Sequence, residues 1–256
     1  MRITLLSILL LIPATLFSQD FQGRASYQFF NNYNDVDWGK KEMSDTDVKM
    51  WKSKLTRESQ TTFELLFTLN ESSWSKVASL ESDGKGGASK GWGESLDQLL
   101  YKNLELQQFA LETELFDKTF LIQDELELPD WQITTESKKI GDYQAQKAIW
   151  TVEESVQKFG SDDKTVEQRA IVAWYTTEIP IPQGPDRYWG LPGLILELKN
   201  GPITYICDQV IINAVEPVKI KRPKNGQKVT AEEFEQIAQE KQEEILKKYN
   251  KSGKKG

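Results

Sequence analysis

The chain has 256 residues, carries a formal net charge of −7 and contains no histidine. An acidic chain gains no electrostatic attraction to nucleic acid or to anionic lipid headgroups, so nucleic acid is excluded as an expected partner. Without histidine, the Ser-His-Asp and Cys-His catalytic systems and imidazole-bound zinc or copper are also excluded. The single cysteine, Cys207, cannot form an intramolecular disulfide and is expected to be a buried small apolar residue.

An apolar run at the start of the chain has the features of a secretory signal peptide. Residues 3–17 are mostly apolar, follow Met1 and Arg2, and end before a polar sequence. The run is shorter than the about 20 apolar residues that a membrane-spanning helix needs. We therefore expect residues 1–18 to be a signal peptide and the mature chain to have no stable membrane insertion.

Apolar residues that alternate with polar ones predict two strands in the first third of the chain, at residues 21–30 and 61–70. The apolar face of the second strand would consist of Phe63, Leu65, Phe67 and Leu69. Between these strands, apolar residues spaced by three and four within residues 35–56 favour a short amphipathic helix. Residues 82–93 contain five glycines and are expected to form a long connection.

The middle of the chain has the pattern of a series of hairpins. Residues 95–106 leave a helical turn and a strand open as alternatives. Residues 107–114 and 118–124 are predicted to pair with each other. A strand at residues 143–153 is followed by a hairpin tip at residues 159–164 and a return strand at residues 165–176. Because both faces of this return strand are apolar, we expect it to be covered on both sides.

A segment rich in proline and glycine, residues 178–198, is the part of the chain whose backbone conformation the sequence restricts most. Pro180 and Pro182 fix φ and remove two donors, so the approach is extended and is neither a helix nor an interior strand. The stretch 191–194 has proline and glycine at the two central positions that a type II turn requires. A strand at residues 194–198 then leads to a hairpin turn and a return strand. We interpret the segment as a structural corner, with a ligand-binding loop as the alternative.

The end of the chain predicts a helix after a basic, proline-bearing linker at residues 216–228. Thr230 and Glu233 have the spacing of a capping box. The helix would extend to about Tyr249. Its single apolar stripe would consist of Phe234, Ile237, Ala238, Lys241, Ile245 and Tyr249.

Many strands linked mostly by hairpins, with few helices, predict a mainly β fold. We expect an antiparallel curved sheet, half-barrel or sandwich-like, with a short N-terminal helix and a C-terminal helix. The expected division is a signal peptide at residues 1–18, a β-rich domain at residues 19–228, and an amphipathic helix with a frayed tail at residues 229–256.

Three stretches of the corner region, residues 173–181, 184–185 and 190–197, resemble the GLPGLI family of secreted proteins of Gram-negative bacteria. The hexapeptide that names the family is present without a change as Gly190, Leu191, Pro192, Gly193, Leu194 and Ile195. Residues 138–148 also look like the strand of the family that leads to a Lys-Ala pair. Many relatives carry a cysteine near position 145, where this chain has Ala145. The resemblance covers roughly residues 131–210. We expect the hexapeptide to be a structural motif.

The resemblance implies a β-rich protein of the cell envelope, exported across the inner membrane to the periplasm or the cell surface. It carries no established activity. Members often sit near outer-membrane transport components, so such a component is an expected partner. A likeness to the half-barrel lipoprotein carriers, with helices in the mouth of a curved sheet, is an expectation about architecture alone.

The best candidates for a ligand or partner loop are the residues beside the corner. Tyr188 and Trp189 are expected to form an exposed aromatic platform. Asp186 and Arg187 flank them and are expected to form an ion pair that fixes the loop. The acidic pairs elsewhere in the chain lack the register of a calcium loop, so no metal site and no cofactor are expected.

The first hypothesis for function is a non-enzymatic binding or accessory module. It would hold an apolar or peptide-like ligand, or a partner, on a concave sheet face near the corner. One alternative is a carboxylate-dependent hydrolase, which requires two acidic side chains about 5 to 10 Å apart in a cleft. The other alternative is a purely structural or interaction protein of the envelope.

Overall fold

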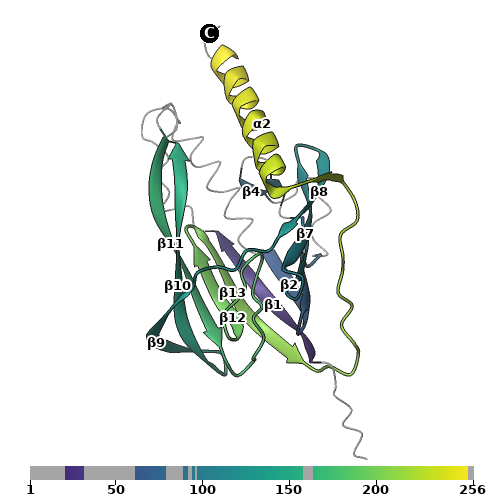
Figure 1. Ribbon diagram of the computed structural model, residues 1–256, viewed down its shortest axis with the longest axis vertical. Coiled ribbons are helices and arrows are strands. Elements are labelled where there is room, and N and C mark those ends of the chain that lie inside the picture. The colour runs from purple at the N-terminus through teal and green to yellow at the C-terminus, as the bar shows by residue number, and fades with distance from the viewer. Residues whose placement is uncertain are drawn as a thin grey trace, which may run out of the picture.

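The computed structural model describes residues 21–31, 61–78, 89–91, 94–95, 97–157 and 164–252 of the chain (Figure 1). The expected signal peptide lies outside these residues. Within them, the elements are β1 (Gln22–Asn31), β2 (Thr61–Thr68), β3 (Glu71–Lys76), β4 (Ser89–Gly91), β5 (Glu94–Ser95), β6 (Leu99–Asn103), β7 (Gln108–Leu115), β8 (Lys118–Glu125), β9 (Gln132–Ile140), β10 (Tyr143–Gln157), β11 (Lys164–Thr176), β12 (Leu194–Asn200), β13 (Ile203–Ile212), β14 (Gln227–Val229) and α2 (Ala231–Ser252).

The strands form one sheet in the order β14-β8-β7-β6-β3-β2-β1-β13-β12-β11-β10-β9, with β5 joining β4 to β7. Among these described strands, β14 runs parallel to β8 and the other paired neighbours are antiparallel. This arrangement confirms the mainly β fold with an antiparallel sheet and a C-terminal helix. The N-terminal helix expected within residues 35–56 lies outside the described residues.

The inner face of the sheet is packed with aromatic side chains from strands that are distant in sequence. Phe63 of β2 stacks on Trp74 of β3 with ring centroids 4.9 Å apart. Tyr205 of β13 meets Trp74 edge-on at 5.5 Å, and Tyr27 of β1 meets it at 5.3 Å. All four side chains are buried. Because each such ring buries about 150–250 Å² of surface, this cluster joins both halves of the sheet.

The period-two pattern of the first two strands is confirmed, with one exception at a turn. Ala25, Tyr27 and Phe29 of β1 are buried, as are the three inward residues of β2. Leu69, which the pattern placed on the same face, is 53% exposed. The strand ends at Thr68, so Leu69 lies in the turn to β3 and has left the alternation. The open choice at residues 95–106 is resolved as the strand β6.

Strand β11 is covered on one face only, so the prediction of a strand covered on both sides is wrong. Ile171, Ala173 and Tyr175 are buried, whereas Trp174 on the outer face is half-buried. There the ammonium of Lys138 lies 4.3 Å from the centroid of the Trp174 ring. Long lysine side chains, with their apolar stems, cover this outer face in place of a second layer of structure.

Strands β10 and β11 form a long hairpin that extends beyond its neighbours (Figure 1). The pairing of β10 with β9 ends at Ile149, and the pairing of β11 with β12 ends at Ile171. Residues 159–163 of the predicted hairpin tip, 159–164, lie outside the described residues. Of the glycine-rich connection predicted at residues 82–93, the structure describes β4 as a short strand.

The capping box predicted for the C-terminal helix is confirmed. The backbone nitrogen of Thr230 donates to Glu233 Oε2 at 2.8 Å, and the backbone nitrogen of Glu233 donates to Thr230 Oγ1 at 3.1 Å. Phe234 packs edge-on against Phe120 of β8, with ring centroids 5.3 Å apart. Just before the helix, the end of the predicted linker is not a loop but β14, which pairs with β8.

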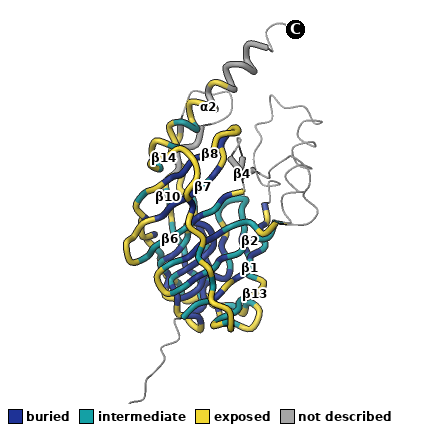
Figure 2. The backbone as a smooth tube through the Cα atoms, turned by 90° about the vertical axis from the view of Figure 1, so that its right-hand side faces the viewer, coloured by how far each residue is buried: buried dark blue, intermediate teal, exposed yellow. Residues whose placement is uncertain are grey.

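The helix then leaves the sheet. In Figure 2 the buried residues gather in the body of the sheet, and α2 projects from it with exposed residues along its first turns. Within the described part of the chain, no helix combines the length and the apolar composition needed to cross a membrane.

Candidate functional site

The corner, defined here as residues 177–193 between β11 and β12, packs against the inner face of the sheet. Ile179 and Ile181 are fully buried, and Leu191 is buried as well. Ser72 of β3 donates through its hydroxyl to Gln183 Oε1 at 2.9 Å. The bond to Ser72 links the corner to a strand in the other half of the sheet. The side chains of the corner therefore cover part of the inner face of the sheet.

Lys102 holds the corner from the opposite half of the sheet. It lies on β6 and its side chain is fully buried. Its Nζ donates to the carbonyl oxygens of Gly184 at 3.0 Å, Asp186 at 2.8 Å and Tyr188 at 3.2 Å. An ammonium group has three donors, so the three carbonyls use all of them. The buried charge is therefore fully hydrogen-bonded by the backbone of the corner.

Burial lowers the pKa of Lys102 from 10.5 to about 7, while the Asp186 carboxylate acts in the opposite direction. Sequence reasoning missed this residue. Lysine is usually exposed, so its residue type argues against an inward position. The signal that could have found it is the period-two spacing, because Lys102 lies two residues after the apolar Leu100 and so shares its face of the strand.

Two hydrogen bonds show why the approach to the corner contains prolines. The backbone nitrogen of Ile181 donates to the carbonyl of Ile179, and that of Gln183 donates to the carbonyl of Ile181, both at 2.8 Å. Each bond encloses one proline, which has no N–H of its own, in a three-residue turn. The segment is neither helix nor strand, which confirms that part of the prediction.

The turn at Pro192-Gly193 is not of type II, so that prediction is wrong. A type II turn needs φ near +80° at its second central residue, and Gly193 is not among the residues with positive φ. Its nitrogen donates to the carbonyl of Leu191 at 2.8 Å, two residues earlier. Glycine is required here for a different reason. A Cβ on Gly193 would lie 2.0 Å from the carbonyl oxygen of Thr176, the last residue of β11.

Of the predicted loop residues, Asp186 and Trp189 face inward. Trp189 is 6% exposed, so the prediction that it forms an exposed platform is wrong. Its Nε1 donates to the carbonyl of Glu127 at 2.9 Å, and Trp131 Nε1 donates to the carbonyl of Trp189 at 2.8 Å. This reciprocal pair fastens the corner to the segment before β9 and accounts for the burial of the ring.

Asp186 has a φ of 51° and is 8% exposed, and Tyr205 donates to its Oδ2 at 3.5 Å. Arg187 is exposed at the surface of the corner. The ion pair of Asp186 with Arg187 stays a prediction. Tyr188 is half-buried and accepts a hydrogen bond from Asn200 Nδ2 at 2.6 Å. Burial, assisted by the charge of Asp186, raises the pKa of Tyr188 to about 12, so the hydroxyl is neutral at physiological pH.

Three half-buried rings lie side by side at the border of the corner, and we call them the aromatic rim. Trp131 and Trp150 have ring centroids 5.9 Å apart, and Trp150 and Tyr188 have centroids 6.5 Å apart. Beside the corner, Leu128 is 62% exposed. It lies against Gly190, where a Cβ would be 2.6 Å from Leu128 Cδ1. Aromatic rings that pack against the protein on one side and are exposed on the other form a surface that apolar or peptide-like ligands can contact.

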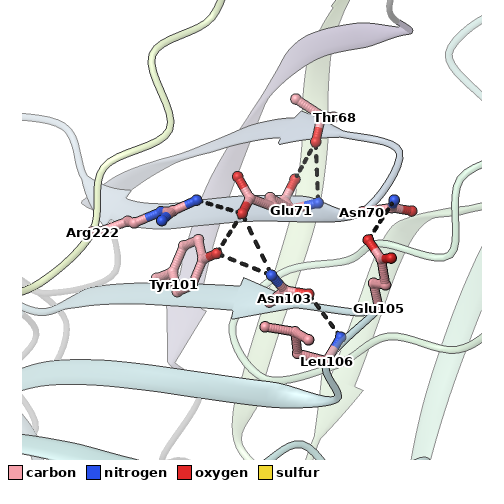
Figure 3. A network of polar contacts seen from close by, with 8 residues as sticks. All are labelled: Thr68, Asn70, Glu71, Tyr101, Asn103, Glu105, Leu106 and Arg222. Atoms are coloured by element: carbon pink, nitrogen blue, oxygen red, sulfur yellow. Dashed lines mark hydrogen bonds and ion pairs between the residues drawn. The ribbon is translucent and has the colours of Figure 1, made fainter.

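A second polar group lies on the sheet surface around Glu71 (Figure 3). Tyr101 donates to Glu71 Oε1 at 2.6 Å, and Arg222 Nη2 donates to the same oxygen at 2.5 Å. The guanidinium of Arg222 also lies 4.9 Å from the centroid of the Tyr101 ring. Arg222 belongs to the stretch between β13 and β14, so this network fastens that stretch to β3 and β6. It contains a single carboxylate in contact with these donors and is a structural clasp rather than an acid-base pair.

The described residues contain no group of three or more cysteine, aspartate or glutamate side chains placed to hold a metal ion. Cys207 is half-buried, and burial raises the pKa of its thiol to about 12. The thiolate that a nucleophile or soft-metal ligand requires is therefore disfavoured.

The match to a protein-family model includes the corner. The model of a family described as "Protein of unknown function (Porph_ging)" matches residues 131–197, from the segment before β9 into β12. A comparison with curated proteins finds no match.

Two solved structures of PNGF-II, determined in different space groups, are similar in fold. Each has a TM-score of 0.51 and 13% sequence identity. They cover 85% and 86% of this chain, which spans 32% and 33% of theirs. The chain therefore corresponds to about a third of the length of those proteins, and at this identity the likeness concerns the fold alone.

Proposed function

We propose that the chain is a secreted cell-envelope protein of GLPGLI type that acts as a non-enzymatic binding or accessory module. Its unchanged hexapeptide, residues 190–195, and a family match that spans the hexapeptide support this assignment. The features of a signal peptide at residues 1–18 support a place in the periplasm or at the cell surface. An outer-membrane transport component is the proposed neighbour.

The observation that carries the proposed binding role is the aromatic rim. Trp131, which precedes β9, Trp150 of β10 and Tyr188 of the corner form a continuous row of partly exposed rings, with centroids 5.9 and 6.5 Å apart. Aromatic side chains supply a large contact area with few rotatable bonds, so little entropy is lost when a ligand settles on them. The exposed Leu128 beside the corner and the exposed Arg187 on its surface add an apolar and a cationic contact.

We place the ligand at the rim because the corner packs on the inner face at this end of the sheet, whereas Trp150, on the same face of β10 as the buried Ala148, is only half-buried. A ligand beside the corner would otherwise have to displace the buried Ile179 and Ile181. Contact at the rim leaves the core unchanged. The ligand class that suits three rings and a neighbouring leucine is an apolar or peptide-like molecule.

The test is native mass spectrometry of the protein purified gently from its own cell envelope. We expect a defined additional mass on the wild type that is absent from Trp150→Ala. Trp174→Ala is the matched control, because Trp174 is also half-buried but lies on the outer face of β11. The control should keep the additional mass. A wild type without bound mass, or a Trp150→Ala variant that retains it, would contradict the proposal.

A further inference from the structure

Strand β10 extends beyond its neighbour β9, so that part of its edge has no described strand beside it (Figure 1). The pairing of the two strands ends where Ile149 lies opposite Gln132, whereas β10 continues beyond this point and stays paired with β11. Just before β9 the backbone N–H of Trp131 donates to the carbonyl of Pro129 at 3.0 Å, in a three-residue turn that ends the extended strand. We call the side of β10 that lies in line with β9, over residues 151–157, the β10 edge.

The backbone groups of Thr151 and Glu153 point toward the β10 edge. In an antiparallel sheet the N–H and C=O of one residue face the same neighbouring strand, and those of the next residue face the other. The carbonyl of Lys147 faces β9, because it accepts a hydrogen bond from Thr134 Oγ1 of that strand at 3.3 Å. Since the register of β10 with β11 is unbroken from residue 146 to residue 157, every second residue after Lys147 faces the same way. Thr151 and Glu153 therefore each present a donor and an acceptor to the β10 edge, and both residues are exposed.

The side chains along the β10 edge are apolar on the inner face of the sheet and polar on the outer face. Trp150 and Val152 are half-buried and pack against the core, and they alternate with the exposed Thr151 and Glu153. Trp131 lies opposite Trp150 when the register of β9 with β10 is extended by one residue, and their ring centroids are 5.9 Å apart. Two rings of the aromatic rim therefore lie on the inner face at the point where the β10 edge begins.

This combination of main-chain groups and rings fits an added strand. A two-stranded ribbon is only marginally stable in water, and a third strand supplies a row of main-chain hydrogen bonds. A residue of the added strand opposite Val152 would face inward, next to the rings of Trp131 and Trp150. Its neighbours in that strand, opposite Thr151 and Glu153, would face outward to solvent. A small apolar molecule would contact the rings but would leave the main-chain groups of the edge unused.

We propose that the ligand of the aromatic rim is an extended peptide segment of a partner protein, which adds as a strand to the β10 edge. This inference rests on the binding role proposed for the rim and names the class of its ligand. The segment has apolar and polar side chains in alternation, with the apolar ones on the rings and the polar ones beside Thr151 and Glu153. The competing occupants are a small apolar molecule, a second copy of this chain and another segment of the same chain.

The test uses a blocked hexapeptide of alternating valine and threonine as the probe and measures residue-resolved hydrogen exchange of the full chain with and without it. Strand addition protects the amides of Thr151 and Glu153, whereas those of Trp150 and Val152 face β11 in either case. At about ten times the Kd of the peptide, we expect exchange of the two edge amides to slow about tenfold, because only the unbound fraction exchanges. Edge amides that stay unprotected at every peptide concentration would overturn the proposal.

Exchange in the absence of the peptide separates the other occupants. Edge amides of Thr151 and Glu153 that exchange slowly without peptide, at every protein concentration, would show that another segment of the chain already covers the edge. Slow exchange that appears only at high protein concentration would show that a second copy pairs there. Either result would overturn the proposal.

Glu153→Pro tests the main-chain contact directly. It removes the N–H that faces the β10 edge and leaves the bonds to β11, since proline is tolerated where its nitrogen points away from the neighbouring strand. We expect peptide binding to weaken by about tenfold or more, because one hydrogen bond is lost and the proline ring occupies the edge. The matched control Glu153→Ala keeps the N–H and should bind as the wild type does. Circular dichroism checks that both variants are folded, and equal binding by the two would overturn strand addition.

The additional mass expected on the wild type distinguishes this inference from the role proposed for the rim. If that mass is present and Trp150→Ala lacks it, but it is not a peptide, the rim binds a ligand and strand addition is wrong. If the mass is absent from the wild type, the proposed role of the rim fails, and this inference fails with it. A peptide whose mass is lost in both Trp150→Ala and Glu153→Pro, and is kept in Glu153→Ala, is the result we expect.

Discussion

Gly193 lies directly against the end of the preceding strand. A Cβ at this position would meet the Thr176 carbonyl oxygen at 2.0 Å and its carbonyl carbon at 2.6 Å. Both atoms belong to the backbone of β11, so neither can move aside as a side-chain tip would. The glycine at this point of the hexapeptide is therefore set by a close approach of two chain segments, and not by the local turn.

We predict that Gly193→Ala lowers the free energy of unfolding by about 3 kcal/mol or more, at or beyond the upper end for overpacking a core. Denaturant unfolding monitored by tryptophan fluorescence measures the change. Gly141→Ala is the control, since nothing lies within 4 Å of a Cβ there and its φ of +57° is the only cost. That cost is about 1–2 kcal/mol. Equal losses for the two variants would show that the contact with Thr176 is not the cause.

Among the elements, β6 and the corner are coupled through one buried charge. The ammonium of Lys102 donates to three carbonyl oxygens of the corner, and these three hydrogen bonds use all of its donors. Its pKa is lowered to about 7 by burial, whereas in the unfolded chain it is near the ordinary value of 10.5. Between these two values the unfolded chain binds more protons at this site than the folded one.

Because of this difference, we predict that the stability of the wild type rises with pH from about 7 toward about 10, since the folded state releases a proton that the unfolded state keeps. Unfolding by denaturant at a series of pH values measures the slope. In Lys102→Met this contribution to the slope should disappear. A wild-type stability that falls across this range, or a Lys102→Met variant with the wild-type slope, would contradict the assignment.

What the sequence predicts at the scale of elements depends on how local the cause is. The alternation of β1 and β2 and the capping box at Thr230 arise from neighbouring residues, and they were predictable. The buried state of Lys102 and the form of the turn at Gly193 depend on segments from elsewhere in the chain. The prediction that β11 is covered on both sides was wrong for the same reason. The side chain that covers Trp174 on the outer face comes from another strand, β9.

The sequence predicted the segment that borders the candidate site, but it did not predict which of its aromatic side chains are exposed. The segment with Tyr188 and Trp189 is where the aromatic rim lies, yet Trp189 is buried against the segment before β9. Trp131 and Trp150 complete the rim from positions far before Tyr188 in the chain. A list of eight tryptophans offers no way to choose these two without the sheet order.

At the scale of the whole molecule, the corner joins the two halves of a curved sheet. Contacts reach it from β3 through Ser72 and from β6 through Lys102, and Tyr27 of β1 donates to the carbonyl of Ile195 just after it, at 2.7 Å. The segment that identifies the resemblance is thus part of the core of the fold. Binding is proposed for its border, where the rings are partly exposed.

The most direct test of this arrangement is hydrogen–deuterium exchange at the corner amides, with the turn at Asp142 as the exposed reference. The amides of Ile181, Gln183 and Gly190 are hydrogen-bonded within the corner, at 2.8, 2.8 and 3.1 Å. We expect them to exchange as slowly as the central strands β1 and β2, because opening the corner requires the core to open. Exchange as fast as at Asp142 would show that the corner is a mobile surface loop and would contradict its place inside the sheet.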